Sequence, residues 1–381
     1  MRKTVLLIVL AAVPVCLPAQ QTTVDQLIQT ISARQAAHAS DSDLAGRVGA
    51  MQLSERLTPA RLGEIAGQFK PGPETAQALS LLADTSAFLP PPASELPDQP
   101  TPAVAAQQAI MNAAVSYVGN TFKHLPNFLA ARLTSSFNDA PLVVTHSGWA
   151  PSRTDLHLAG TFEQEITYRD GREASLRSVS TTRANAKQGA SPPGLTSSGE
   201  FGPVLITVLT DASKGQIAWT RWEKTPSGIA AVFTYNIPAA ASHYRVEFCC
   251  VHGSSAIGNL KGGSVGDNEG AGPNANFYRG TPAYHGTLTI DPATGAILRL
   301  TVDPELDSDG PLLRSAIAVD YAPVDIGGQI HTCPVHSIAL SLSRTRLGGD
   351  MSDRTIFRIN EVQFTRYHRF GSEAHIVSTP N

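Results

Sequence analysis

Pairs of short segments in which polar and apolar residues alternate, joined by tight turns, constrain the fold of this chain more than any other feature. Segments 161–168 and 173–182 flank Arg169-Asp170-Gly171-Arg172, and Asp-Gly between alternating segments predicts a β-hairpin. Two more pairs share this layout, namely 216–223 with 229–237 and 284–291 with 296–303. Adding alternating segments at 243–251, 314–321, 329–342 and 354–367 predicts about ten or eleven strands joined mostly by short turns.

The strand pattern also indicates how the sheet is covered. In segment 354–367, apolar residues recur on both alternating faces, and the side that carries Phe357 and Ile359 also carries Glu361 and Gln363. One covered face and one wetter face are typical of a large antiparallel sheet. The sequence therefore predicts an α+β protein, in which a helical N-terminal element precedes a large antiparallel sheet, open or curled as a half β-barrel.

Helical spacing dominates the chain before this sheet. Val24, Leu27, Ile28 and Ile31 share one helical face, and further helices are predicted around Thr58-Pro59 and at 74–82; these make a helical element over 21–87. A proline-dense linker follows at 88–101, because proline cannot continue a helix or a central strand. Residues 102–381 then form the predicted main domain, whose first helix begins at Thr101-Pro102 and presents an apolar stripe to the sheet.

The first twenty residues predict export. Met1-Arg2-Lys3 precede the apolar run 4–15, and the small residue Ala19 follows. A basic start, a short apolar run and a small residue are typical of a cleaved secretory signal, so residues 1–20 are predicted to be a signal peptide and the mature chain to be periplasmic or secreted. Later runs are too short to cross a bilayer, which predicts no transmembrane segment in the mature chain.

Charge and cysteine content narrow the classes of partner. A formal net charge of -3, without clustered Lys and Arg, argues against nucleic acid as a partner.

Cys249, Cys250 and Cys333 remain after signal cleavage, and in an oxidising compartment one of the adjacent pair, taken as Cys250, is predicted to bond Cys333. His331 and His336 flank Cys333, but their spacing matches no zinc pattern, so neither a metal nor another cofactor is predicted; solvent-facing histidines beside a disulfide explain them.

Part of the predicted sheet resembles a known family. The residues that carry the likeness are Trp219-Thr220-Arg221-Trp222, Val232-Phe233-Thr234-Tyr235, the run 284–291 and Thr294-Gly295-Ala296 with its continuation to Arg299. Over roughly 199–369, this order of strands and turns resembles LolA-like lipoprotein carrier and sensor domains, which are periplasmic half-barrels with an apolar cavity. The whole mature chain, including Leu53-Ser54-Glu55-Arg56-Leu57, Leu125-Pro126-Asn127-Phe128 and the run 196–202, also resembles uncharacterised exported proteins of Acidobacteria.

The resemblance implies a binding function. If the sheet curls as in that family, aromatic residues on its concave face and the helix over 102–123 line a pocket for an acyl chain or another apolar molecule. The predicted ligand-binding residues are Trp219, Trp222, Tyr235, Tyr284 and Phe122. Core packing explains the same residues, so a second hypothesis is a structural or protein-interaction module of the cell envelope whose cavity is filled by its own helix.

Three further motifs have simpler explanations than chemistry. Gly262-Gly263-Ser264-Val265-Gly266 has G-x-S-x-G spacing but lacks the strand and helix of a nucleophile elbow, so an extracytoplasmic hydrolase using Ser264 is only the third hypothesis and no catalytic residue is predicted. The acidic run 303–310 lacks the closing glutamate of a calcium loop and is interpreted as a solvated turn. Glu163 and Glu165 share a strand face and are interpreted as exposed polar residues.

Overall fold

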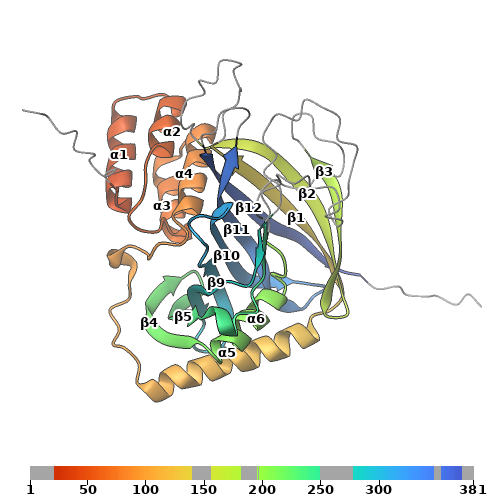
Figure 1. Cartoon of the computed structure of the whole chain (residues 1–381). Helices are drawn as coiled ribbons and strands as arrows, with labels where there is room; N and C mark the ends of the chain where they lie inside the picture. Colours follow the sequence, from red (N-terminus) through yellow and green to blue (C-terminus); the bar gives the residue numbers. More distant parts are fainter. Residues whose placement is uncertain are drawn as a thin grey trace, which may run out of the picture.

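The computed structural model describes residues 21–139, 156–181, 195, 197–248, 278–346 and 353–370. Within these ranges it has an N-terminal group of helices followed by a ten-stranded antiparallel sheet, which confirms the predicted α+β class (Figure 1). The sheet is not closed, as expected for an open half-barrel. Residues 1–20, the predicted signal peptide, and 262–266, the G-x-S-x-G motif, lie outside the described residues.

Four helices form the N-terminal unit, and local signals start each of them. They are α1 (Val24–Ala36), α2 (Asp41–Gly49), α3 (Pro59–Phe69) and α4 (Pro73–Thr85). Thr23 and Gln26 form a capping box at α1, and the hydroxyl of Thr58 caps α3 directly before Pro59. Gly72 supplies no side-chain cap to α4; instead the carboxylate of Asp41 accepts from the amides of Glu74 and Thr75.

The helical unit has a core of its own. Buried side chains from all four helices and the loop after α2 meet there: Val24, Leu27, Ile31, Leu44, Val48, Leu53, Leu57, Ile65, Leu79 and Leu82. Because this cluster is separate from the core of the sheet, we treat α1–α4 as one packed body that rests on the sheet. Residues 86–103, which include the short helix η1 (Ala93–Glu95), connect it to the long helix α5 (Val104–His124).

The sheet follows the predicted hairpins and adds strands to them. Its spatial order is β3-β2-β1-β12-β11-β10-β9-β8-β5-β4. The strands are β1 (Phe128–Asn138), β2 (His157–Arg169), β3 (Arg172–Thr181), β4 (Gln216–Thr225), β5 (Gly228–Ile237), β8 (Tyr284–Ile290), β9 (Ile297–Pro304), β10 (Leu312–Asp325), β11 (Ile330–Arg346) and β12 (Asp353–Arg369). A separate two-stranded sheet joins β6 (Val246–Phe248) to β7 (Tyr278–Gly280), and η2 (Ala239–Ala241) follows β5. Among the described helices, none combines the length and apolar character needed to span a bilayer.

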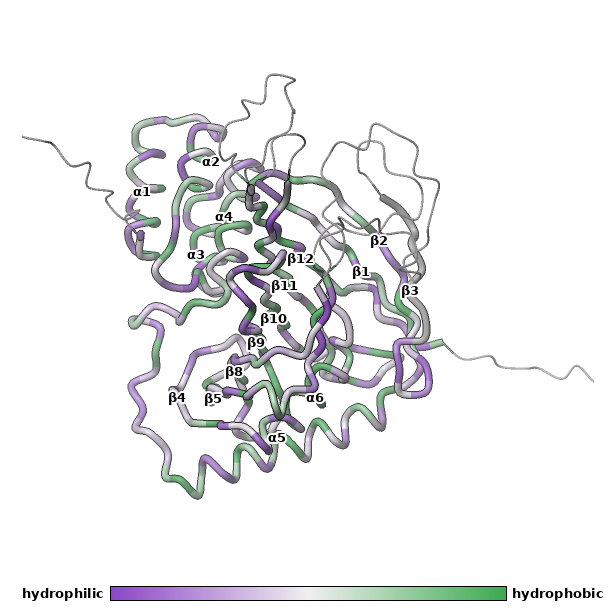
Figure 2. Tube along the Cα trace, in the orientation of Figure 1, coloured by the Kyte–Doolittle hydropathy of each residue, from purple (hydrophilic) through white to green (hydrophobic). Residues whose placement is uncertain are grey.

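Two helices cover one face of the sheet, which we call the inner face. α5 runs from the β4 side toward β1, and α6 (Pro203–Ala212) lies between α5 and the strands (Figure 1). Along α5 the hydropathy changes from residue to residue, as expected for a helix with one buried face (Figure 2). Ile110, Ala114 and Val118 of α5 join Val204, Leu205 and Val208 of α6 in the main core.

The opposite, outer face of the sheet carries the helical unit. Ala87, at the end of α4, packs with Ile338 of β11 and Ile359 of β12, and Leu81, Phe88, Leu156 and Phe357 border the contact. Helices therefore cover both faces of the central strands, which explains why consecutive residues of β10 are buried from Ser315 to Val319.

Candidate functional site

Two of the predicted ligand-binding residues lie deep in the core. Tyr235 of β5 and Tyr284 of β8 are 1% and 0% exposed, and their rings meet edge to face at 5.8 Å. The Tyr235 hydroxyl donates to the carbonyl of Thr301 at 2.5 Å, and the Tyr284 hydroxyl donates to Oδ2 of Asp211 at 2.7 Å. Both polar ends thus have protein partners, so the two residues serve as core residues in this structure.

The other three predicted residues lie at the border of the same core. Trp219 and Trp222 of β4 are partly buried, with ring centroids 4.8 Å apart, and Nε1 of Trp222 donates to the carbonyl of Pro100 in the connection before α5. Phe122 of α5 is partly buried against Gly202, where an added Cβ would lie 2.8 Å from the ring. The structure therefore brings all five residues to one apolar cluster.

Helices α5 and α6 occupy the inner face that the resemblance assigned to a ligand. The side chains of Ala114, Val118 and Val208 are 3% exposed or less, and they pack in the same cluster as Tyr235 and Tyr284. Among the described residues, close packing of this kind fills the space between α5, α6 and the strands with the side chains of the chain itself. In this conformation the predicted pocket is thus a packed core.

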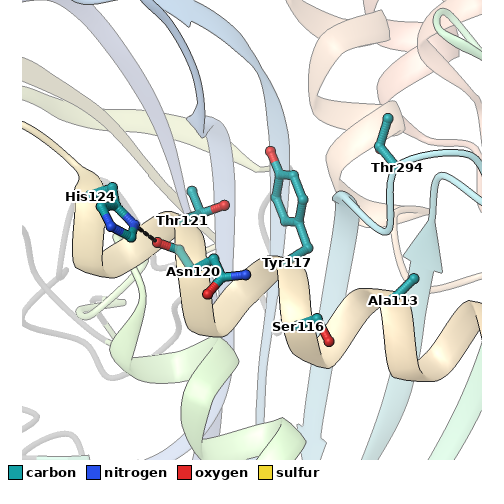
Figure 3. Close-up of a pocket in the computed structure, with 7 residues that line it drawn as sticks. All are labelled: Ala113, Ser116, Tyr117, Asn120, Thr121, His124 and Thr294. Carbon is teal, nitrogen blue, oxygen red and sulfur yellow. Dashed lines mark hydrogen bonds between the residues drawn. The ribbon is translucent and has the colours of Figure 1, made fainter.

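A groove of about 540 Å³ runs along the side of α5 that does not enter this core (Figure 3). Its lining comes from α5 and the turn between β8 and β9: Ala113, Ser116, Tyr117, Asn120, Thr121, His124 and Thr294. Nδ1 of His124 lies 2.7 Å from the carbonyl of Asn120, and the Tyr117 hydroxyl lies 2.7 Å from Oγ1 of Thr332. The larger side chains of the groove are thus engaged with the protein, and they offer no converging set of reactive groups.

A buried carboxylate links α6 to the following loop. Asp211 is fully buried, and it accepts hydrogen bonds from the Tyr284 hydroxyl and from the backbone amide of His243. Nδ1 of His243 lies 2.5 Å from Oδ1 of Asp211, while most of the imidazole is exposed. An Asp–His pair is one element of acid–base sites, but here every contact of Asp211 also serves to join α6 to β8 and to the chain after β5.

We expect Tyr284→Phe to lower the free energy of unfolding by about 2 kcal/mol, because it removes a hydrogen bond to a buried carboxylate. Tyr235→Phe is the matched control: it removes a bond to a neutral carbonyl, and we expect a loss of about 1 kcal/mol. Burial raises the pKa of both phenols, so both remain neutral donors throughout the neutral range. Urea unfolding followed by circular dichroism measures the two losses, and equal values would contradict the assigned role of Asp211.

The outer face holds a second cluster of charged groups, built by the register of the sheet. Arg299 of β9 and His336 of β11 both pair with Asp320 of β10, so the three side chains stand in one row. Arg299 forms an ion pair with Asp320, and Nδ1 of His336 lies 3.2 Å from Oδ2 of the same carboxylate. On the other side of the ring, Nε2 of His336 lies 3.7 Å from Glu361 of β12 and 3.9 Å from Asp84 of α4.

The pKa values in this cluster move in opposite directions. Burial raises the pKa of Asp84 to about 7, the carboxylate of Glu361 adds to the rise, and the imidazolium of His336 opposes it. Burial alone would lower the pKa of His336, but its contacts with Asp320, Glu361 and Asp84 raise it to about 10. Although burial favours protonation of Asp320, the charges of Arg299 and His336 hold its pKa below the usual range. Near neutral pH, His336 is thus charged, and Asp84 keeps its proton to a higher pH than an exposed aspartate does.

A third cluster of charged side chains, which contains Arg132, Glu173 and Glu200, is buried on the inner face near β1. Nη2 of Arg132 lies 3.6 Å from Oε1 of Glu200 and donates to the carbonyl of Ser197 at 2.9 Å. The Ser337 hydroxyl donates to the same Glu200 oxygen at 3.5 Å. Burial and the carboxylate of Glu200 together raise the pKa of Glu173 to about 7. This part of the inner face is polar, in contrast to the apolar part beneath α5 and α6.

The cysteine and histidine predictions have separate outcomes. Cys333 is buried and has no disulfide partner among the residues that the structure describes, and burial raises its pKa to about 12. Because Cys249 and Cys250 lie outside the described residues, the Cys250–Cys333 bridge stays a prediction. The interpretation of His336 as a solvent-facing residue was wrong, since neighbouring carboxylates on three elements surround it.

The acidic motifs take up local structural contacts. In the run 303–310, a side-chain oxygen of Asp307 accepts from the amide of Asp309, and Asp303 pairs with Arg314 at 3.3 Å. Glu163 forms an ion pair with Arg366 beside a groove of about 260 Å³ over β1. Within the described residues, no group of three or more His, Cys, Asp or Glu side chains is arranged to hold a metal ion.

Sequence reasoning missed the outer-face cluster, although one signal for it was present. Asp320 interrupts the small and apolar run Ala316-Ile317-Ala318-Val319, and Asp84 follows Leu81-Leu82-Ala83 at the end of an apolar helix. A charged residue within a covered segment calls for a partner, because an unpaired buried charge is costly. That partner lies on another strand or helix, so only the register of the sheet identifies it.

Comparison with known proteins adds no further constraint on the function of this site. No protein-family model matches the chain, and neither a curated protein nor a solved structure matches it.

Proposed function

We propose that this chain is a non-catalytic exported protein of the cell envelope, a half-barrel module that is filled by its own helices and acts through contacts with other envelope proteins. The observation that supports this proposal is the packing of α5 and α6 on the inner face. There the predicted ligand residues Tyr235 and Tyr284 are buried and hydrogen-bonded to protein groups. A ligand can occupy this space only after α5 has left it.

A lipid- or lipoprotein-binding function is the second candidate, and one observation favours it. The surface beneath α5 is apolar, and the aromatic residues of β4, β5 and β8 that the LolA-like resemblance assigns to a ligand lie together there. α5 is joined to the helical unit by residues 86–103, which contain no regular element except η1. In this function α5 would be displaced by an acyl chain.

Native mass spectrometry of the mature protein, purified from a bacterial periplasm before and after mild solvent extraction, distinguishes the two functions. We expect the apo mass in both samples and no uptake of added phospholipid or fatty acid, because the interior is already filled. A discrete, extractable adduct of lipid mass would overturn the self-filled module and support the second candidate.

The same preparation tests the third hypothesis, a hydrolase that uses Ser264. We expect no ester hydrolysis above background. Hydrolysis that is abolished by Ser264→Ala would overturn the non-catalytic proposal.

A further inference from the structure

The contact between the helical unit and the sheet combines a small apolar patch with a group of ionisable side chains. Ala87 packs in one apolar cluster with Ile338 and Ile359, and Nη2 of Arg299 donates to the Ala87 carbonyl at 3.0 Å. A second anchor lies nearby, where Arg56 pairs with Glu223 of β4. Because the helical unit has its own core, it can separate from the sheet as a body while remaining folded.

Asp84 is the most deeply buried ionisable side chain of the outer-face cluster. Its side chain is 7% exposed, and among the described residues its Oδ2 atom has no hydrogen-bond partner. The groups that face it are His336 of β11, Glu361 of β12, Asp320 of β10 and Arg299 of β9. Two of these are carboxylates, so an ionised Asp84 adds a third negative charge to the cluster while its own side chain is buried.

We propose that the helical unit docks on the outer face of the sheet through a proton-linked latch, in which Asp84 takes up a proton when the contact closes and releases it when the contact opens. The latch lies on the face opposite α5 and α6, and it is independent of what the inner face binds. The other ionisable partners stay together when the contact opens, because His336, Asp320, Glu361 and Arg299 all belong to the sheet. Asp84 alone moves from this group into water.

The direction of the pH effect follows from linkage. A carboxyl group with a pKa of about 7 in the closed state and the ordinary value of 3.8 in the open state binds more protons when closed. Asp84 therefore favours the closed state in full below pH 3.8, and its contribution declines as the pH rises to about 7. Above pH 7, Asp84 is deprotonated in both the closed and the open state, and it no longer makes the opening equilibrium depend on pH.

A buried thiol at the contact measures this opening. In a chain with Cys249→Ser and Cys250→Ser, the thiol of Ala87→Cys is buried in the cluster with Ile338 and Ile359 and should react with a thiol reagent only when the contact opens. Leu81→Cys, at the edge of the same patch, is a second probe if Ala87→Cys fails to fold. Cys333, buried in a separate cluster, reports global unfolding in the same molecule. Rates are divided by those of glutathione at each pH, which removes the effect of thiol ionisation.

We expect the normalised rate of the Ala87→Cys thiol to rise about tenfold per pH unit between pH 5 and 6.5 and to level off above pH 7, as release of one proton requires. The normalised rate of Cys333 should change much less. In Asp84→Asn, the asparagine is a neutral isostere of the protonated acid. The normalised rate of the Ala87→Cys thiol in this variant should therefore not change with pH. Asp98→Asn, which neutralises an exposed carboxylate in the connecting segment, should leave the wild-type profile unchanged.

Three results would each overturn the latch. A flat profile in the chain that keeps Asp84 excludes proton uptake on closing. A rise that persists in Asp84→Asn assigns the proton to another group. A parallel rise at Cys333 means that the whole chain unfolds rather than that the helical unit undocks.

Discussion

Arg132→Leu is expected to lower the free energy of unfolding by about 3–5 kcal/mol, because it leaves a buried carboxylate without its counter-charge. Arg132 is 4% exposed and Glu200 is 1% exposed, so water does not replace the lost partner. The pKa of Glu173 is already raised to about 7 by burial and by Glu200, an effect that Arg132 opposes. Without the guanidinium, the attraction that opposes this rise is lost. Urea unfolding near pH 7 measures the loss.

Two companion variants separate the charge from the packing of the arginine. Arg169→Leu removes an exposed arginine that lies 3.4 Å from Asp170 and should change stability by less than about 0.5 kcal/mol. The double variant Arg132→Leu with Glu200→Leu should recover much of the lost stability, since both charges are then absent. If the double variant is as unstable as the single one, the lost packing of Arg132 over the Phe364 ring, 5.6 Å from its centroid, is the main effect.

Gly295→Ala is expected to cost about 2–5 kcal/mol, because the new methyl group meets the backbone of α5. Gly295 has a φ of +77°, and an added Cβ would lie 2.5 Å from the carbonyl carbon and oxygen of Ala113. Left-handed backbone costs a non-glycine residue about 1–2 kcal/mol, and forcing atoms into a packed contact costs about 1–3 kcal/mol more. The helix must shift away from the β8–β9 turn to accept this substitution.

Gly171→Ala is the matched control for the backbone conformation. Gly171 has a φ of +79° in the β2–β3 turn, and nothing lies within 4 Å of an added Cβ. This variant should therefore lose only the conformational part, about 1–2 kcal/mol. The difference between the two losses, measured by urea unfolding, reports how tightly α5 is held. Equal losses would contradict a close fit of α5 and would favour the second candidate function, in which α5 is displaced.

The two faces of the sheet thus have distinct relations to the helices that cover them. On the inner face, α5 and α6 contribute apolar side chains to the main core, so removing them exposes a large apolar surface. On the outer face, the helical unit rests on a small apolar patch bordered by ion pairs. This contact involves fewer apolar groups, and in the proposed latch its opening depends on the protonation of Asp84.

Local sequence signals predicted several elements of the fold. Asp170-Gly171 predicted the β2–β3 turn, where both residues adopt positive φ, and Thr58-Pro59 predicted the start of α3. Other elements were missed for a physical reason. α6 was not predicted because Val204-Leu205-Ile206 and the residues around it are apolar on several sides, so no helical stripe stands out. β1 lies between β2 and β12, where parts of both faces are covered, and its apolar and polar residues do not alternate cleanly.

By itself, the sequence determined the fold class, the helical start and the hairpins, because capping, turn chemistry and alternation act between residues close together in the chain. Only the tertiary structure decided that Tyr235 and Tyr284 are core residues, since this depends on where α5 and α6 pack. It also decided that Asp84 meets His336, which stands 252 positions later in the chain. Contacts of this kind arise from strand register and from the packing of separate bodies, and no periodicity within a single segment encodes them.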